Sequence, residues 1–134
     1  MTSQELTEAI KNGRKSFTGE DLRNQSFYGL DLMEADFSGA DLRGAGFGDT
    51  ILHWARFDGA DIRGAYFRNS DLKGAFFSGS DLRGALFDET GLQWAHFSGA
   101  DLRGACSVSC DFSSSYFDGA DLRGTEIGKE SLGH

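Results

Sequence analysis

Residues 40–44 read ADLRG, and the same five letters return at residues 100–104. The centre of each unit is apolar, because every fifth residue from Phe17 to Leu132 is Phe, Leu or Ile, with Ser107 the single exception among 24 positions. A period of five matches neither the helix repeat of roughly 3.6 residues nor the two-residue alternation of a strand. We therefore expect the chain to turn at every unit and to point each central side chain at a common axis.

A second, longer period sets the size of one coil. Aspartate recurs every 20 residues from Asp21 to Asp121, and arginine does the same from Arg23 to Arg123. Four five-residue sides close a square coil in 20 residues. The sequence therefore predicts an all-β solenoid, a parallel β-helix of about six coils.

The residues that flank each centre indicate inward packing and turns. Two residues before the centre, 19 of the 24 sites hold Ala, Ser, Thr or Cys, which indicates a second inward position for a small side chain. Two residues after the centre, Gly occurs 13 times. A positive φ at the third residue of a type II turn explains this choice, because glycine carries no steric penalty there. The turns at Trp54 and Trp94, where glycine is missing, are left open between type II and looser forms.

These units resemble the pentapeptide-repeat family, whose pattern A-[DN]-L-X-X is matched at residues 40–44 and 100–104. The resemblance extends from residue 15 to residue 132. It implies a right-handed quadrilateral β-helix, and the handedness comes from the family alone. In repeat proteins of this kind each coil contacts only its neighbours.

The chain is expected to divide into a cap and a solenoid. Residues 1–14 lie outside the pattern, and Thr2 and Glu5 can form a capping box, so a short N-terminal capping α-helix and turn are predicted before a β-helix at residues 15–134. The C-terminal end of the solenoid is expected to have only a weak cap, formed by four residues: Leu132, Glu126, Lys129 and Glu130. The structural core is predicted to include Phe37, Leu42, Phe57, Ile62, Phe77, Leu82, Phe97 and Leu102.

The composition is acidic and gives no sign of a membrane segment. The 134 residues carry a formal net charge of −8, with no run of 18 apolar residues and no apolar stretch at the N-terminus. We therefore expect a cytoplasmic protein without membrane association, present as a monomer or a weak dimer. Cys106 and Cys110 are expected to stay reduced, because one points outward and the other inward. We predict no cofactor.

The four outer faces are numbered in chain order, starting from the side centred on Leu22 and Leu42. The first face carries the Asp and Arg columns, which we interpret as a self-neutralising ladder, with an anion- or acid-binding strip as the alternative. The candidate partner contacts are Tyr28, Tyr66 and Leu86 on the second face, Trp54 and Trp94 on the third, and Phe76 and Tyr116 on the fourth. Two alternatives stay open: harmless surface variation on the second face, and shielding of the turns by the two tryptophans.

Catalysis finds little support in this pattern. The glycines follow the five-residue repeat and not the spacing of a phosphate loop. His53 and His96 fall on different faces, so a two-histidine metal site is not expected. The repeat pattern also builds no concavity, and small-molecule sites are normally concave, so we do not expect an enzyme. The acidic balance also disfavours direct nucleic-acid binding. We predict a non-catalytic protein-interaction or structural rod that presents exposed aromatic columns to an unidentified protein partner.

The resemblance supplies an alternative function. Some members of the family are acidic rods that bind DNA gyrase in place of DNA and confer quinolone resistance, so an acidic DNA mimic of gyrase or another type II topoisomerase is the second hypothesis. The sign of the net charge agrees with it. Its density agrees poorly, because duplex DNA carries about one charge per 1.7 Å. A third option is association through the weakly capped C-terminal end.

Overall fold

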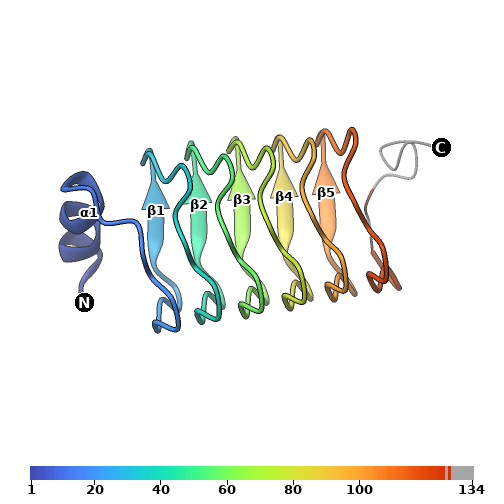
Figure 1. Cartoon of the computed structure of the whole chain (residues 1–134), viewed down its shortest axis with the longest axis horizontal. Coiled ribbons are helices and arrows are strands. Elements are labelled where there is room, and N and C mark those ends of the chain that lie inside the picture. The colour runs from blue at the N-terminus through green and yellow to red at the C-terminus, as the bar shows by residue number, and fades with distance from the viewer. Residues whose placement is uncertain (126, 128–134) are drawn as a thin grey trace.

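The chain folds as one N-terminal helix followed by a stack of coils (Figure 1). The computed structural model describes residues 1–125 and residue 127. The helix α1 covers Ser3–Lys11. Five short strands, one per coil, then form a single parallel sheet in chain order: β1 Ser26–Tyr28, β2 Gly46–Gly48, β3 Tyr66–Arg68, β4 Leu86–Asp88 and β5 Cys106–Val108.

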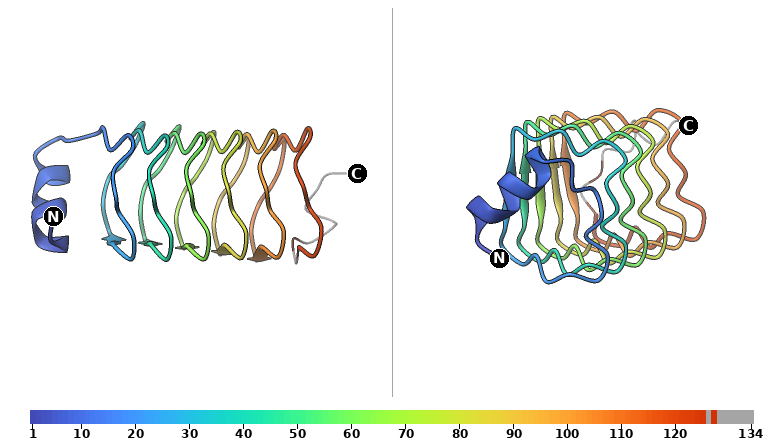
Figure 2. Two further views of the ribbon diagram at one scale, coloured as in Figure 1. Left: turned by 90° about the horizontal axis from the view of Figure 1, so that it is seen from below. Right: turned by 60° about the vertical axis from the view of Figure 1, so that its left-hand side comes forward.

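Every coil takes 20 residues. Within the sheet, Phe27 pairs with Phe47, and Phe47 pairs with Phe67. The other three sides pair through single parallel bridges, such as the one between Asp41 and Asp61. The stacked, four-sided coils are visible when the rod is turned to bring its N-terminal end forward (Figure 2). The predicted parallel β-solenoid is thus confirmed.

The number of coils is slightly lower than expected. The strands β1 to β5 lie 20 residues apart, so the chain completes four full turns between Phe27 and Ser107. Partial coils flank these turns on both sides. The expectation of about six coils is therefore slightly too high, because it counted repeat units to the end of the sequence.

The core is a column of stacked rings and aliphatic side chains. Successive phenylalanines of one side stack at 4.9 Å between ring centroids for Phe57 and Phe77, and their planes differ by 4°. The neighbouring column meets them edge-on, at 6.3 Å and 89° for Phe67 and Phe77. Offset stacking and edge-to-face contact are the favoured arrangements of aromatic pairs. All eight predicted core residues have an exposed fraction of 0%: Phe37, Leu42, Phe57, Ile62, Phe77, Leu82, Phe97 and Leu102.

Three of the four corners of a coil are closed turns, and from the second coil onward a side chain bridges the fourth corner. At the closed corners the N–H of the residue after the turn donates to the central carbonyl, as from Ala45 to Leu42 at 3.0 Å. At the corners after β2, β3 and β4, a buried hydroxyl of Thr50, Ser70 or Thr90 bridges two coils. The Oγ1 of Thr50 donates to the carbonyl of Phe27 at 2.7 Å and lies 2.8 Å from that of Gly48. This explains why Thr, Ser and Cys replace Ala in this inward column.

The helix α1 covers the open end of the first coil. The predicted capping box is present, since Thr2 Oγ1 accepts from the Glu5 N–H at 3.1 Å and Glu5 Oε1 accepts from the Thr2 N–H at 2.9 Å. Leu6 and Ile10 are buried in one cluster with Phe17. The short N-terminal helix is therefore confirmed, and its apolar face removes the first coil from water.

Two expectations concern parts of the chain beyond this core. The C-terminal finish was placed on residues that lie outside the described ones: Leu132, Glu126, Lys129 and Glu130. Within residues 1–125 and 127, no helix has the length and apolar character needed to cross a membrane.

Candidate functional site

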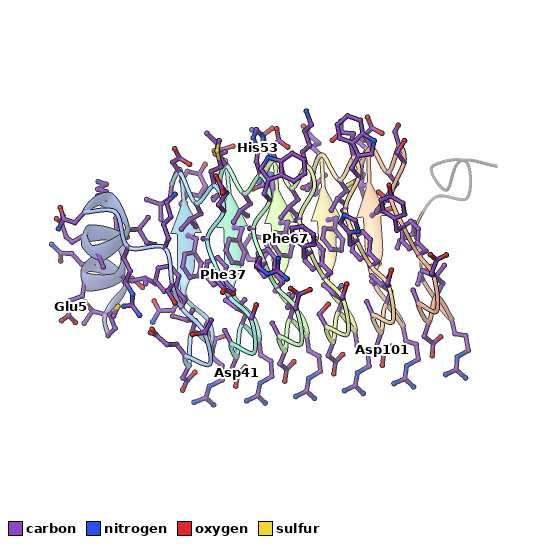
Figure 3. All side chains as sticks on the ribbon, in the orientation of Figure 1. Glu5, Phe37, Asp41, His53, Phe67 and Asp101 are labelled. Atoms are coloured by element: carbon purple, nitrogen blue, oxygen red, sulfur yellow. The ribbon has the colours of Figure 1, made fainter. Side chains whose placement is uncertain are left out.

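The first face is closed by an ion-pair ladder. Arg63 forms two contacts with Asp61 in its own coil, Nε to Oδ1 at 2.8 Å and Nη2 to Oδ2 at 2.6 Å. Its Nε also lies 3.7 Å from Oδ2 of Asp81 in the next coil. The pattern repeats along one edge of the rod, where Asp41 and Asp101 are labelled (Figure 3). This is the geometry of the predicted self-neutralising ladder.

The arginines keep these aspartates ionised. The pKa of Asp121 is lowered from 3.8 to about 2, first by the side-chain hydrogen bond from Arg123 and then by that residue's backbone N–H. For Asp61, the bond from Arg63 lowers the pKa although partial desolvation opposes it. Each carboxylate thus accepts hydrogen bonds from its own chain. Because an aspartate neutralises each arginine, the first face has no net positive charge that would attract an anionic or acidic ligand.

The ladder is neutral, so the net charge belongs to the rest of the molecule. Six aspartates face six arginines in it, from Asp21 to Asp121 and from Arg23 to Arg123. The remaining chain carries fifteen acidic and seven basic residues, which gives the whole net charge of −8. The net negative charge of the chain is therefore carried by residues outside the ladder.

Trp54 and Trp94 project from equivalent turns of the third face. Their φ angles are 61° and 60°, in the left-handed region that glycine occupies at most other turns. Each turn is closed by a bond from the following alanine N–H, at 3.0 Å and 3.1 Å. The open question about these turns is thereby answered, because a closing bond and a positive φ at the third residue describe type II. The two indoles are 44% and 46% exposed.

The first indole is seated on a glycine of the next coil. A Cβ added to Gly74 would lie 2.0 Å from the Trp54 ring, so the ring fills the space above that residue. The corresponding position after Trp94 is Ser114. Over the Trp94 ring stands the Nζ of Lys73, 5.0 Å from the centroid, in a cation–π contact. Trp54 therefore does shield a neighbouring turn, and it still leaves nearly half of its surface exposed.

The residue before each tryptophan reaches into the next coil. His53 Nε2 lies 2.6 Å from Asp71 Oδ2, and Gln93 Nε2 donates to Asp111 Oδ2 at 2.9 Å. The stretches at residues 50–57 and 90–97 thus have equivalent cross-coil contacts, two coils apart. A hollow of about 260 Å³ lies beside the second stretch and is lined by Lys73, Gln93, Trp94, Ser113 and Ser114.

On the second face, two tyrosines cover the glycine strand β2. A Cβ on Gly48 would lie 2.7 Å from the ring of Tyr28, and one on Gly46 would lie 2.6 Å from that of Tyr66. Both glycines are consequently buried. Leu86 pairs in register with Tyr66 and is 39% exposed. The tyrosine rings therefore pack on the backbone of a neighbouring coil and do not stand free.

The outer column of the fourth face is a continuous stack. The Arg56 guanidinium lies 4.6 Å from the centroid of the Phe76 ring. Phe76 and His96 stack at 4.9 Å, and His96 and Tyr116 at 4.7 Å, with planes 10° and 11° apart. Because the rings stack along the rod, their flat sides pack against one another and their edges point to solvent. This column supports the coil stacking more than it offers a free aromatic face.

Among residues 1–125 and 127, the two histidines do not share a face of the coil. His53 lies on the third face and His96 on the fourth. In the part of the chain that the structure describes, no group of three His, Cys, Asp or Glu side chains is placed to hold a metal ion. Cys106 and Cys110 are free thiols, and burial raises the pKa of the Cys110 thiol.

The structure distributes the seven candidate contacts over three faces. The second and fourth faces are on opposite sides of the square coil, so one partner surface cannot touch all seven residues. The third face adjoins both. In Figure 3 His53, of the third face, lies on the edge opposite Asp41 and Asp101.

The sequence analysis did not identify three glycines on which aromatic rings pack: Gly46, Gly48 and Gly74. Each of them is 20 residues from an aromatic residue, and this spacing could have indicated the contact.

A family model described as pentapeptide repeats matches the chain in eight copies, over residues 16–44, 50–88 and 90–127. A pentapeptide repeat protein from the cyanobacterium Cyanothece 51142 has a similar structure, with a TM-score of 0.71 and 18% identity, and the match covers 94% of this chain and 96% of that chain. A pentapeptide repeat protein from the Arabidopsis thaliana thylakoid lumen is 32% identical with a TM-score of 0.58, covering 84% and 72%.

A looser likeness concerns QnrB1, described as a plasmid-mediated fluoroquinolone resistance protein. The identity is 21% and the TM-score 0.34, with 90% of this chain and 88% of that chain covered. A superposition this loose carries no functional argument. No curated protein matches the sequence significantly.

Proposed function

This chain belongs to the pentapeptide-repeat family, and on that premise we propose that it is a non-catalytic protein-interaction rod whose third face contacts a protein partner. The observation that supports this most is the pair Trp54 and Trp94, both nearly half exposed at equivalent turns. A cytoplasmic location and a monomeric or weakly dimeric state belong to the same proposal.

The backbone at the two tryptophans adds to the argument. A positive φ is costly for a bulky side chain, by about 1–2 kcal/mol for a single residue. Glycine would remove this cost at both sites, as it does at Gly64 and Gly84. Tryptophan is also the side chain most enriched among residues that dominate binding energy. The two tryptophans have a strained backbone, expose their indoles and occupy equivalent turns. A contact with a partner explains these features better than stability alone.

The test is capture of partners from a lysate with matched variants. The wild-type rod, a Trp54→Ala/Trp94→Ala variant and a Tyr28→Ala/Tyr66→Ala control would be immobilised, and the retained proteins identified by mass spectrometry. We expect a protein that is lost with the tryptophan variant and kept by the tyrosine control. Equal retention by all three rods would contradict a contact on the third face.

The acidic DNA mimic is the alternative, and one observation favours it. The whole excess of acidic residues lies outside the neutral ladder. On the third face, however, the aspartate column is interrupted, since Asp31, Asp71 and Asp111 alternate with Ile51 and Gly91. Carboxylates in every second coil are sparser than the phosphates of DNA. Retention of a type II topoisomerase by all three rods would favour the mimic.

A further inference from the structure

We propose that the third face binds a proline-rich segment in the polyproline II conformation that carries Lys or Arg residues. This inference rests on the proposed function and names the kind of partner that the face fits. It depends on the spacing of the two indoles, on the hydrogen-bond donors between them, and on the charge around them.

The spacing of the indoles follows from the stacking of the core. Phe57 and Phe77 stack at 4.9 Å, and Phe77 and Phe97 also stack at 4.9 Å. These two steps lead from the coil of Trp54 to the coil of Trp94. The tryptophans have matching φ angles and each precedes its phenylalanine by three residues. Equivalent backbone atoms of Trp54 and Trp94 are therefore about 9.8 Å apart along the rod.

A polyproline II segment matches this distance. It has three residues per turn and rises about 3.1 Å per residue, so residues i and i+3 point the same way about 9.3 Å apart. A β-strand returns to the same side after two residues, at about 6.7 Å, and places residue i+3 on the opposite side. An α-helix has a comparable step of about 10.5 Å between residues i and i+7.

The coil between the indoles argues against a helix. A docked helix would also press residues i+3 and i+4 onto that coil. There the Trp54 ring already fills the space above Gly74, and Lys73 stands over Trp94. A polyproline II segment leaves a gap between its contacts, because its other side chains point away.

The polar groups of the face complement a polyproline II backbone. Such a segment has no internal hydrogen bonds, so its carbonyl groups need donors from the binding surface. The indole N–H groups, the Lys73 ammonium and the Gln93 amide are donors on this face. The hollow of about 260 Å³ next to Trp94 is lined by Lys73, Gln93 and two serine residues. It gives an apolar side chain a place beside a ring and beside these donors.

The charge on the face selects a basic segment. Between residues 31 and 34 and at the corresponding positions of the later coils there are four acidic residues and one lysine: Asp31, Glu34, Asp71, Asp111 and Lys73. At the adjoining corner stand Asp49 and Glu89. Hydrogen bonds from Ser113 and Gln93 lower the pKa of Asp111 and keep it ionised at neutral pH. Arginines that flank the prolines would meet carboxylates on either side of the indoles.

Intrinsic fluorescence tests the proposal, because the chain has only two tryptophans and both lie in the proposed site. The probe is a synthetic twelve-residue peptide in which two arginines precede a Pro-x-x-Pro segment. We expect a saturable change in emission with the full-length protein. Replacing both prolines by alanine should weaken binding at least about tenfold, as should Trp94→Ala when binding is followed by calorimetry. Leu86→Ala on the second face should leave binding unchanged.

Three results would overturn the inference: no saturable binding, equal binding of the proline-free peptide, or tighter binding of a basic helical peptide with anchors at i and i+7. Circular dichroism checks that Trp94→Ala keeps the fold, and Asp111→Asn serves as a second variant that should weaken binding with less salt dependence. The experiments distinguish failure of the proposed function from failure of the proline-rich partner. If the tryptophans are needed to capture a protein but the peptide fails to bind, the proposed function stands and the proline-rich partner is wrong.

Discussion

The first and third faces are opposite sides of one coil, and they use the same backbone differently. On the first face, each Arg is bonded to the Asp of its own coil, and each except the last, Arg123, also lies near the Asp of the next coil. On the third face, the cross-coil contacts involve His53 with Asp71 and Gln93 with Asp111, and they leave two indoles exposed. One face satisfies its own polar groups, whereas the other keeps apolar surface and an excess of negative charge.

The residues that set the fold are therefore distinct from those that make a face available for contact. The inward residues set the coil, and they are much the same behind both faces. The outward residues decide whether a face is closed or available. Substitutions inside should therefore disturb both faces together, and substitutions outside should disturb one.

The largest effect is expected from Phe77→Ala, because this substitution removes part of the core that supports both faces. Phe77 is fully buried and stacked on both sides. The loss should lower the free energy of unfolding by about 3–5 kcal/mol, as is typical for truncating a buried phenylalanine. Chemical denaturation measures it. The adjacent Phe76→Ala is the control, and it should cost only about 1 kcal/mol because that ring lies in the outer stack. Similar losses for both variants would contradict the assignment of inner and outer positions.

A smaller effect is expected from Gly74→Ala, because this substitution disturbs only the third face. Its Cβ would meet the Trp54 ring at 2.0 Å, whereas Gly79, at nearly the same φ, has nothing within 4 Å. Gly74→Ala should therefore destabilise the protein by about 1 kcal/mol more than Gly79→Ala. It should also shift the tryptophan emission to the red. Adding Trp54→Ala should remove the excess, and an excess that persists would show that the ring is not the cause.

A weaker effect is expected from Arg63→Gln on the first face. The side chain bonds Asp61 and approaches Asp81, but both partners are solvent-accessible, and exposed ion pairs contribute less than about 1 kcal/mol. Unfolding at low and high salt measures the change, with Arg68→Gln as a control outside the ladder. The fluorescence of the tryptophans should not respond. A loss of several kcal/mol would mean that the ladder, and not the core, holds the coils together.

The smallest effect on stability is expected from acid titration of the ladder. The pKa of Asp121 is about 2 in the folded protein, below its ordinary 3.8. A lowered folded pKa contributes stability above the unfolded value, and this contribution is lost as the pH falls from about 4 through 2. Carboxyl carbon NMR shifts give the midpoint directly. In Arg123→Gln the midpoint should rise toward the ordinary value, and an unchanged midpoint would show that Arg123 is not the cause.

The sequence predicts the inside of this molecule better than its outside. The five-residue spacing of Phe37, Leu42 and their equivalents was enough to place the core, because an inward position tolerates few side chains. The direction in which an outer ring leans could not be predicted. The Tyr28 ring packs on Gly48 of the next coil, whereas the Tyr66 ring packs on Gly46 of the preceding coil, although each tyrosine is 20 residues from its glycine. The χ angles of each ring decide this, and a residue pattern does not contain them.

An amide and indole NMR map of the protein, titrated with the arginine- and proline-containing peptide, would show which face is available. If the third face is available and the first face is closed, we expect both indole N–H signals and the amides around Lys73 and Gln93 to shift. The amides around Asp61 and Arg63 should stay in place. Shifts centred on the first face, or spread evenly around the coil, would contradict this expectation.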